Sequence, residues 1–326
     1  EALASYDRAL SVDPVHANAL HNRGIALLDL NRYEDAAAAF QRLLDASPEY
    51  PYVPGYRLHA LLHCCDWREY ERHVLQVVGD TRAGKPTAGP FNFLPISDSA
   101  ADQLNCAKQF VASEFPETAQ PVWDSARYDH GRIRVAYLSG DFRNHATAYL
   151  MAGLFEAHDR TRFEISALSF GPDENGEMRD RLVPAFDRFV NVRHNSDREV
   201  ASMLRELEID IAVDLHGFTK GGRAGIFSQR PAPVQVNYLG YPGTMGEQYM
   251  VEISGDRRGI PDEHRCWYTE KVVYMPDSYQ VNDSRRRIAE RTPTRLEAGL
   301  PESGFVFCCF NSCYKIAPRL FDIWMR

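Results

Sequence analysis

The sequence predicts two architectures in one chain, helical repeats followed by a doubly wound α/β sheet. Two observations support this prediction. Apolar and small residues recur at a spacing of 34 positions within residues 1–50. From Arg132 onward, short runs rich in β-branched and aromatic residues alternate with segments of helical periodicity. A chain of 326 residues is long enough to fold as two or three domains.

Residues 1–50 contain an internal repeat. The residues that recur after 34 positions are Ala2, Tyr6, Ala9 and Pro14, matched by Ala36, Phe40, Leu43 and Pro48. This period, with small residues where two helices touch and a proline closing the unit, resembles the tetratricopeptide repeat. Such repeats either bind a protein or peptide in their groove or act as a helical spacer. Because a half-repeat leaves an apolar face uncovered, we expect at least one further repeat before Glu1.

Residues 51–130 keep the helical periodicity but lose the repeat. Residues 51–79 are predicted to form an irregular helical pair that caps the repeats. Residues 80–90 are polar and rich in Gly, Pro and Thr, which is typical of a linker. A further helix is predicted at 98–114, followed by a loop that enters the next domain.

Residues 131–300 are predicted to form a Rossmann-like domain. Strands are expected at 132–138, 163–170, 186–192, 209–214, 233–238 and 271–275, and helices at 146–158, 177–184 and 196–207. This alternation favours a parallel sheet with helices on both faces. The sequence has no Gly-x-Gly-x-x-Gly after the first strand, no Gly-Lys-Ser phosphate loop and no Asp-x-Asp pair.

Three polar or glycine-rich loops follow predicted strands, at residues 139–147, 214–223 and 240–246. The carboxyl ends of parallel strands meet at one edge of a sheet, where such folds bind ligands. We therefore expect the three loops to border one crevice. His145, in the first loop, could act as a base, a phosphate donor or a helix cap, but one histidine in a strand–loop–helix is common, so a simple loop histidine is the more ordinary interpretation.

Residues 301–326 are interpreted as the first strand–helix unit of a second nucleotide-binding domain. The apolar run 305–310 is predicted to be a strand, and a helix is expected from about Pro318. Lys315 falls between them, a position suited to contact with a phosphate. Since the chain stops inside the expected helix, we expect this second domain to be truncated.

Composition excludes several classes of protein. The net charge of -8 argues against a nucleic-acid surface. No run of about 18 apolar residues is present, so no membrane span is expected, and the N-terminus lacks a signal-peptide pattern. The seven cysteines form neither Cys-x-x-Cys nor a zinc-type spacing. We therefore expect reduced thiols, no structural metal and a cytoplasmic location.

Five segments in a fixed order make a resemblance specific. They are CDWREY (65–70), SGDFRNHAT (139–147), DLHGFTKGGR (214–223), RPAPVQVNYLGYPGT (230–244) and FNSCYK (310–315). Together with the repeats they resemble the O-linked N-acetylglucosamine transferase family, which includes SPINDLY-type and bacterial members. The resemblance implies a GT-B fold of two Rossmann-like domains. It also implies inverting, metal-independent transfer of N-acetylglucosamine from UDP-GlcNAc to Ser or Thr hydroxyls of proteins.

The same resemblance implies partners and site residues. The nucleotide-sugar is a substrate, so no cofactor is expected, and the protein or peptide acceptor would lie along the repeats and the cleft. His145 corresponds to a histidine that is either the base or a group that orients the donor, and Asp98 is a second candidate base. The donor-binding residues implied are Asp141, Asn144, Thr147, Leu239, Gly240, Pro242, Tyr314 and Lys315, with Lys315 neutralising the departing nucleotide.

Three departures from the family pattern leave alternatives open. Pro95-Ile96-Ser97 is followed by Asp98 where animal members have a histidine, and Ser312 stands where they have glutamine. The nucleoside contacts of the second domain, including a His-Thr-Thr segment, are absent. We therefore expect this chain alone to be inactive. A protein O-fucosyl- or glucosyltransferase using another nucleotide-sugar, or a catalytically silent repeat scaffold, remains as an alternative.

Overall fold

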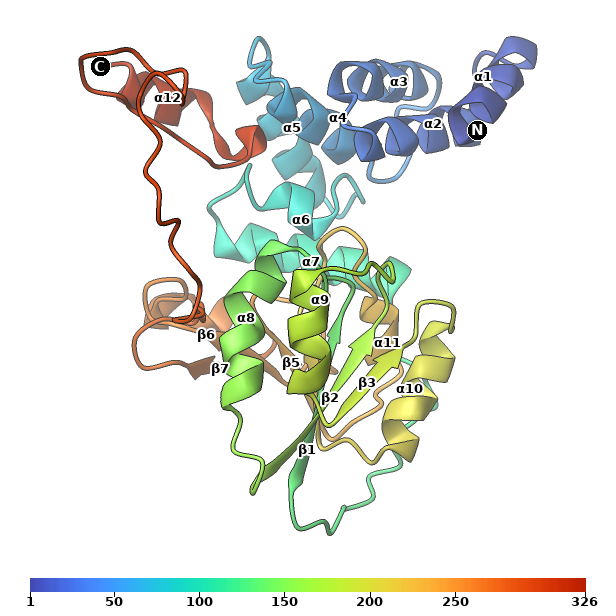
Figure 1. Ribbon diagram of the computed structural model, residues 1–326. Coiled ribbons are helices and arrows are strands. Elements are labelled where there is room, and N and C mark those ends of the chain that lie inside the picture. Colours follow the sequence, from blue (N-terminus) through green and yellow to red (C-terminus); the bar gives the residue numbers. More distant parts are fainter.

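The computed structural model describes all residues 1–326 and shows a helical part stacked above an α/β sheet (Figure 1). The helices of the first part are α1 (Ala2–Val12), α2 (Ala17–Asp29), α3 (Tyr33–Ala46), α4 (Val53–His63), α5 (Tyr70–Arg82), α6 (Pro90–Phe93) and α7 (Ala100–Glu114). None of the helices in the structure has both the length and the apolar character needed to cross a membrane.

The predicted repeat is built as successive packed helices. α1 packs on α2 and α2 on α3, and Leu20, Leu27, Phe40 and Leu43 are fully buried between them. A Cβ on Gly24 would come within 2.4 Å of the Phe40 ring. The absence of a side chain at this position therefore lets α2 approach α3 closely, which is the role expected of a small residue in such a repeat.

The second part is a seven-stranded sheet in the order β3-β2-β1-β4-β5-β6-β7, and every neighbouring pair is parallel. The strands are β1 (Ile133–Ser139), β2 (Phe163–Ser169), β3 (Arg188–Asn191), β4 (Ile211–Asp214), β5 (Val234–Asn237), β6 (Glu252–Gly255) and β7 (Lys271–Tyr274). The predicted fold class, helical repeats followed by a Rossmann-like α/β sheet, is confirmed.

Helices cover both faces of the sheet, because successive side chains of a strand point to opposite sides. Val135 and Tyr137 of β1 pack with α8 (Ala146–Ala157) and α9 (Glu177–Leu182). Ala136 and Leu138 pack in a second core with α10 (Asp197–Glu206) and α11 (Ala224–Ser228). Val111 of α7 belongs to this second core as well.

α7 is shared by two cores. Its residue Cys106 packs into the cluster that holds α4, α5 and α6 together, while Val111 packs against the sheet. The side chains of Cys106, Ala107 and Val111 are all buried. The helical part and the sheet are therefore joined by a packed helix, rather than only by a loop.

The structure departs from the predicted elements in several places, and the short helices α6 and α11 are among the elements that were not predicted. β6 was not predicted, since its four residues, EISG, include a single large apolar side chain. The predicted helix at 177–184 ends at Leu182 and continues as a 3-10 turn, η1 (Val183–Ala185), because Pro184 has no N–H for a helical hydrogen bond. The predicted strand at 305–310 is wrong.

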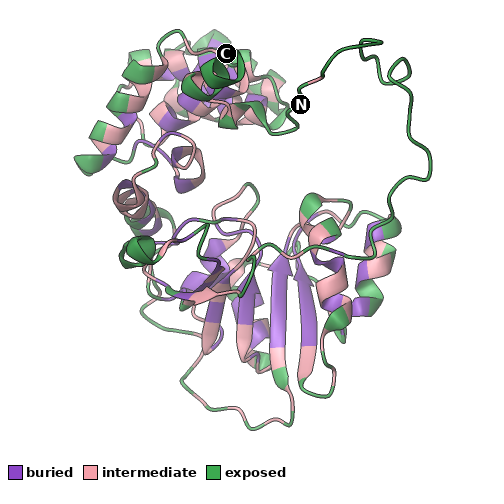
Figure 2. Ribbon diagram, turned by 90° about the vertical axis from the view of Figure 1, so that its left-hand side faces the viewer, coloured by how far each residue is buried: buried purple, intermediate pink, exposed green.

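Residues 305–310 form no strand, and the side chains of Phe305 and Phe310 are 82% and 97% exposed. A lone strand has no neighbour to accept and donate its backbone hydrogen bonds. Figure 2 shows that the stretch after β7 is a largely exposed connection that returns to the helical part. There the 3-10 turn η3 (Cys313–Lys315) and α12 (Pro318–Trp324) follow, the latter at the predicted position.

Candidate functional site

The first two predicted loops meet because their strands are neighbours. β1 pairs with β4 in a register that places Leu138 opposite Asp214, and the N–H of Leu215 donates to the carbonyl of Leu138 at 3.2 Å. Gly140 lies two residues after Leu138, and His216 lies two residues after Asp214. The two residues therefore face each other. The Gly140 nitrogen lies 3.0 Å from Nε2 of His216.

Asp141 is the centre of the site. Its Oδ2 lies 3.3 Å from Nδ1 of His145 and 3.2 Å from Nε2 of His216. Burial raises the pKa of the Asp141 carboxyl, but the hydrogen bond and charge of His216, with the charges of His145 and Arg143, outweigh burial. The pKa of Asp141 is therefore below its ordinary value, and the group is a carboxylate at neutral pH.

His145 occupies the N-cap position of α8, where the Thr147 nitrogen lies 3.3 Å from Nδ1. Its side chain is 41% exposed, against 14% for Asp141. Burial lowers the pKa of His145 and exceeds the opposing effect of Asp141. The ring is therefore mainly neutral at pH 7, the form in which an imidazole nitrogen can accept a proton.

The turn at 239–242 borders the same pair of loops. Leu239 adopts a left-handed backbone with φ of 70°, and the N–H of Gly240 donates to the carbonyl of Tyr238 at 2.9 Å. A Cβ on Gly240 would lie 2.2 Å from the carbonyl oxygen of Leu215. Glycine is required here, because the turn packs against the backbone that carries His216. The carbonyl of Pro242 accepts a hydrogen bond from the Tyr268 hydroxyl at 3.2 Å.

Asn144 ties the first loop to the neighbouring helix. Its Oδ1 accepts a hydrogen bond from the N–H of Met178 in α9 at 3.3 Å. Arg143 lies on the other side of the loop, 3.7 Å from Asp141 and 3.3 Å from Glu174. Asp141, Asn144 and His145 thus lie on one loop, and Thr147 follows in the first turn of α8.

Asp98 lies outside this cluster. It is an exposed residue in the turn that precedes α7, and its carboxylate forms neither a hydrogen bond nor an ion pair. Asp98 therefore makes no contact with His145 in the structure, and its role as a second base stays a prediction.

Tyr314 and Lys315 are also separated from His145 and Asp141. They belong to η3, which packs on α4, and the Tyr314 ring lies 5.0 Å from the rings of both His59 and His63. Lys315 is exposed and forms no ion pair. The structure thus places this pair against the helical part and makes no contact between it and the 239–242 turn.

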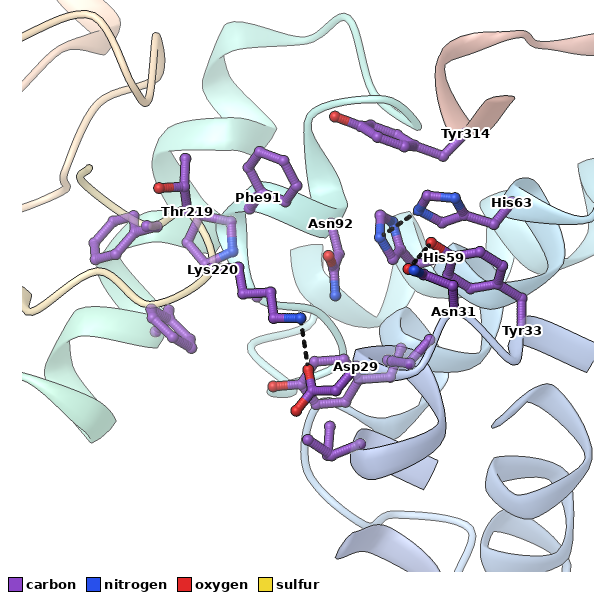
Figure 3. Close-up of a pocket in the computed structure, with 17 residues that line it drawn as sticks. Asp29, Asn31, Tyr33, His59, His63, Phe91, Asn92, Thr219, Lys220 and Tyr314 are labelled. Carbon is purple, nitrogen blue, oxygen red and sulfur yellow. Dashed lines mark hydrogen bonds and ion pairs between the residues drawn. The ribbon is translucent and has the colours of Figure 1, made fainter. Parts of the chain in front are cut away.

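A cavity of about 400 Å³ lies between the helical part and the loop after β4. Figure 3 shows that His59, His63 and Tyr314 line one side and that Thr219 and Lys220 line the other. Burial, reinforced by the neighbouring His63, lowers the pKa of His59 to about 4. The histidine pair is therefore uncharged at neutral pH.

His216 is the site residue that the sequence analysis does not single out. It is only 4% exposed, and its Nδ1 lies 3.2 Å from the Thr219 hydroxyl. The sequence shows that His216 follows the strand that ends at Asp214, but the pairing of this strand with β1, which brings His216 to Asp141, is known only from the structure. No group of three or more His, Cys, Asp or Glu side chains in the structure is arranged to hold a metal ion.

Comparison with known proteins gives consistent matches. The sequence profile described as glycosyl transferase family 41 matches residues 112–292, and a tetratricopeptide repeat profile matches residues 1–51. The probable UDP-N-acetylglucosamine–peptide N-acetylglucosaminyltransferase SEC of Arabidopsis thaliana is 30% identical over 287 residues, which is 82% of this chain. A UDP-N-acetylglucosamine–peptide N-acetylglucosaminyltransferase of Caenorhabditis elegans is 29% identical over 70% of this chain.

A solved structure, a mutant O-GlcNAc transferase from Thermobaculum terrenum, matches 99% of this chain with a TM-score of 0.71 and 27% sequence identity. The match covers 61% of that structure. The chain spans 29% of the length of the Arabidopsis relative and 21% of the Caenorhabditis relative.

Proposed function

The chain belongs to glycosyl transferase family 41, and from this membership we propose that the protein carrying it transfers N-acetylglucosamine from UDP-GlcNAc to Ser or Thr hydroxyls of proteins. The relatives named above are called UDP-GlcNAc–peptide transferases, which supports this donor and this class of acceptor. The observation that carries the proposal is the Asp141–His145 pair at the end of β1, inside the matched region.

In the proposed mechanism the acceptor hydroxyl attacks the anomeric carbon while the diphosphate leaves from the opposite face. A neutral His145 accepts the proton of the hydroxyl, or instead orients the donor through a hydrogen bond. Asp141 holds the ring through Nδ1. The configuration at the anomeric carbon is inverted in this single displacement, and no metal takes part in the proposed reaction.

The leaving diphosphate develops charge that fixed cations stabilise. We assign this role to Lys315, with Tyr314 beside it. Because Lys315 lies on the helical part in this structure, the assignment requires residues 310–315 to lie across the crevice during turnover. Leu239, Gly240, Pro242 and Thr147 are proposed to border the sugar.

The proposed acceptor is a protein segment that lies along the repeats and enters the crevice past the cavity of Figure 3. A cytoplasmic location is part of the proposal, and the seven unpaired thiols are its support. Nucleic acid is not a proposed partner, since the net charge is -8.

The test is transfer of radiolabelled sugar to a library of Ser- and Thr-containing peptides by the full protein, with UDP-GlcNAc, UDP-glucose and GDP-fucose as separate donors. We expect label from UDP-GlcNAc to be incorporated, and His145→Ala to abolish most of it. Incorporation only from another donor would replace the sugar in the proposal. No incorporation from any donor, with peptides still bound, would leave a silent scaffold as the function.

A further inference from the structure

The site contains a symmetric arrangement around one carboxylate oxygen. Oδ2 of Asp141 lies 3.3 Å from Nδ1 of His145 and 3.2 Å from Nε2 of His216. Each of these ring nitrogens also faces one backbone nitrogen, that of Thr147 at 3.3 Å and that of Gly140 at 3.0 Å. Each ring nitrogen must therefore either donate to the carboxylate or accept from a backbone N–H.

For His145 this choice decides whether the ring can act as a base. If Nδ1 accepts from the Thr147 N–H, a neutral ring carries its proton on Nε2, which then cannot accept another. If Nδ1 donates to Asp141, Nε2 keeps its lone pair. A hydrogen bond to a charged group is stronger than one between two neutral groups. An ionised Asp141 therefore selects the form with Nε2 free.

His216 is built to keep Asp141 ionised. Its ring is buried beside Phe170, with centroids 5.2 Å apart. On its other side, Oγ1 of Thr219 lies 3.2 Å from Nδ1 and 2.9 Å from the carbonyl oxygen of His216, so its one hydrogen can serve only one of the two. When that hydrogen goes to Nδ1, the ring proton is on Nε2 and faces Oδ2 of Asp141 at 3.2 Å. The charge-assisted bond to Asp141 is then stronger than the neutral bond that Nε2 would otherwise accept from the Gly140 N–H.

Two other charged groups, Arg143 and Asp214, lie near Asp141 and His216. Arg143 lies 3.7 Å from Asp141 and favours its ionised form. Asp214 accepts a hydrogen bond from the backbone N–H of His216 at 2.8 Å, not from its ring. His216 is thus the group that donates to Asp141 from inside the fold, while Arg143 approaches from a more exposed side.

We propose that His216 is a positioning residue: its Nε2–H holds Asp141 ionised and in place, and Asp141 then keeps the proton of His145 on Nδ1, leaving Nε2 free. The arrangement links the ends of β1 and β4 through side chains. The role of this arrangement in sugar transfer rests on the proposed function, but the positions of the protons on the two histidines do not.

The test is NMR of the 326-residue chain labelled with ¹⁵N-histidine and with ¹³C at the Asp carboxyl groups. In the wild type at pH 7.5 we expect His216 to be protonated at Nε2, and His145 at Nδ1. In His216→Phe the titration midpoint of Asp141 should rise by about one pH unit or more, a tenfold change in its ionisation constant. In His216→Gln the side-chain amide replaces the Nε2 donor, and the midpoint should return towards the wild-type value.

His158→Gln is the matched control. His158 lies at the other end of α8 and contacts the Tyr137 hydroxyl at 2.9 Å, so its replacement should leave the Asp141 midpoint unchanged. An unprotonated Nε2 on His216 in the wild type overturns the proposal, even if His216→Phe fails to fold. An Asp141 midpoint that is the same in His216→Phe and the wild type also overturns it. These outcomes do not depend on sugar transfer, so failure here is distinguishable from failure of the proposed function.

Discussion

Nζ of Lys220 lies 2.8 Å from Oδ1 of Asp29, an ion pair that joins the loop after β4 to the last residue of α2. Figure 3 shows this contact among the side chains that line the cavity. The pair thus connects the repeats directly to the loop that carries His216, although both side chains are largely exposed, at 76% and 55%.

We expect this ion pair to contribute little to stability. Exposed pairs are screened by water and salt and contribute about 0–1 kcal/mol. A double-mutant cycle with Lys220→Ala and Asp29→Ala, measured by urea unfolding, should therefore give a coupling free energy below about 1 kcal/mol. Added salt should reduce it further. A coupling of several kcal/mol that is insensitive to salt would contradict the exposed geometry.

Two glycines in helices should respond oppositely to the same substitution. In Gly24→Ala the new methyl would meet the Phe40 ring at 2.4 Å, and overpacking of this kind costs about 1–3 kcal/mol. In Gly79→Ala, in α5, nothing lies within 4 Å, and alanine should stabilise the helix by about 0.5–1 kcal/mol. Urea denaturation measures both changes. A Gly24→Ala variant as stable as the wild type would mean that α2 and α3 are not in close contact.

His145 should set the acidic limb of the pH–rate profile if it is the base. Burial lowers its pKa below the ordinary 6.5, so turnover should fall as the pH drops through this lowered value and stay constant above pH 6.5. His145→Asn keeps a donor for Asp141 and an acceptor for the Thr147 N–H but cannot titrate. This variant should therefore fold normally, retain donor affinity and lose the limb. Weakened donor binding with the limb intact would instead identify His145 as a donor-orienting residue.

Lys315 should matter for turnover and not for stability. Its side chain is exposed and unpaired, so Lys315→Ala should leave the free energy of unfolding within about 0.5 kcal/mol of the wild type. In the full protein the same variant should cut turnover by about a hundredfold, the loss typical of one fixed electrostatic group. Lys108→Ala, at an exposed lysine of α7, is the control and should change neither quantity. Transfer at the wild-type rate in Lys315→Ala would remove the leaving-group role.

The fold was largely predictable because its signals are local. The strands at 132–138 and 163–170 are rich in apolar residues, many of them β-branched or aromatic, and the 34-residue spacing marks the repeats before any contact is known. β6 could not be predicted, since its position depends on pairing with β5 and β7. The strand predicted at 305–310 was wrong because strand formation also depends on pairing. The composition of this segment suits a strand, but no partner strand lies beside it.

The location of the site could be predicted from the sequence, but the contacts between its side chains could not. The strand ends identify the three loops, and Asp141 and His145 meet as expected on one of them. The contact between Asp141 and His216 depends on strand order and register, which the sequence does not state. The packing of Tyr314 against His59 of α4 likewise depends on the tertiary structure, because the two residues are far apart in the sequence.

The packing of α7 into two cores has a geometric consequence. Each residue of an α-helix advances about 1.5 Å and turns about 100° around the axis. Inserting one residue between Cys106 and Val111 would therefore rotate the repeats about the sheet by roughly that angle. α7 thus fixes the orientation of the repeats relative to the sheet edge that carries Asp141, and a change in the length of this helix would alter that orientation.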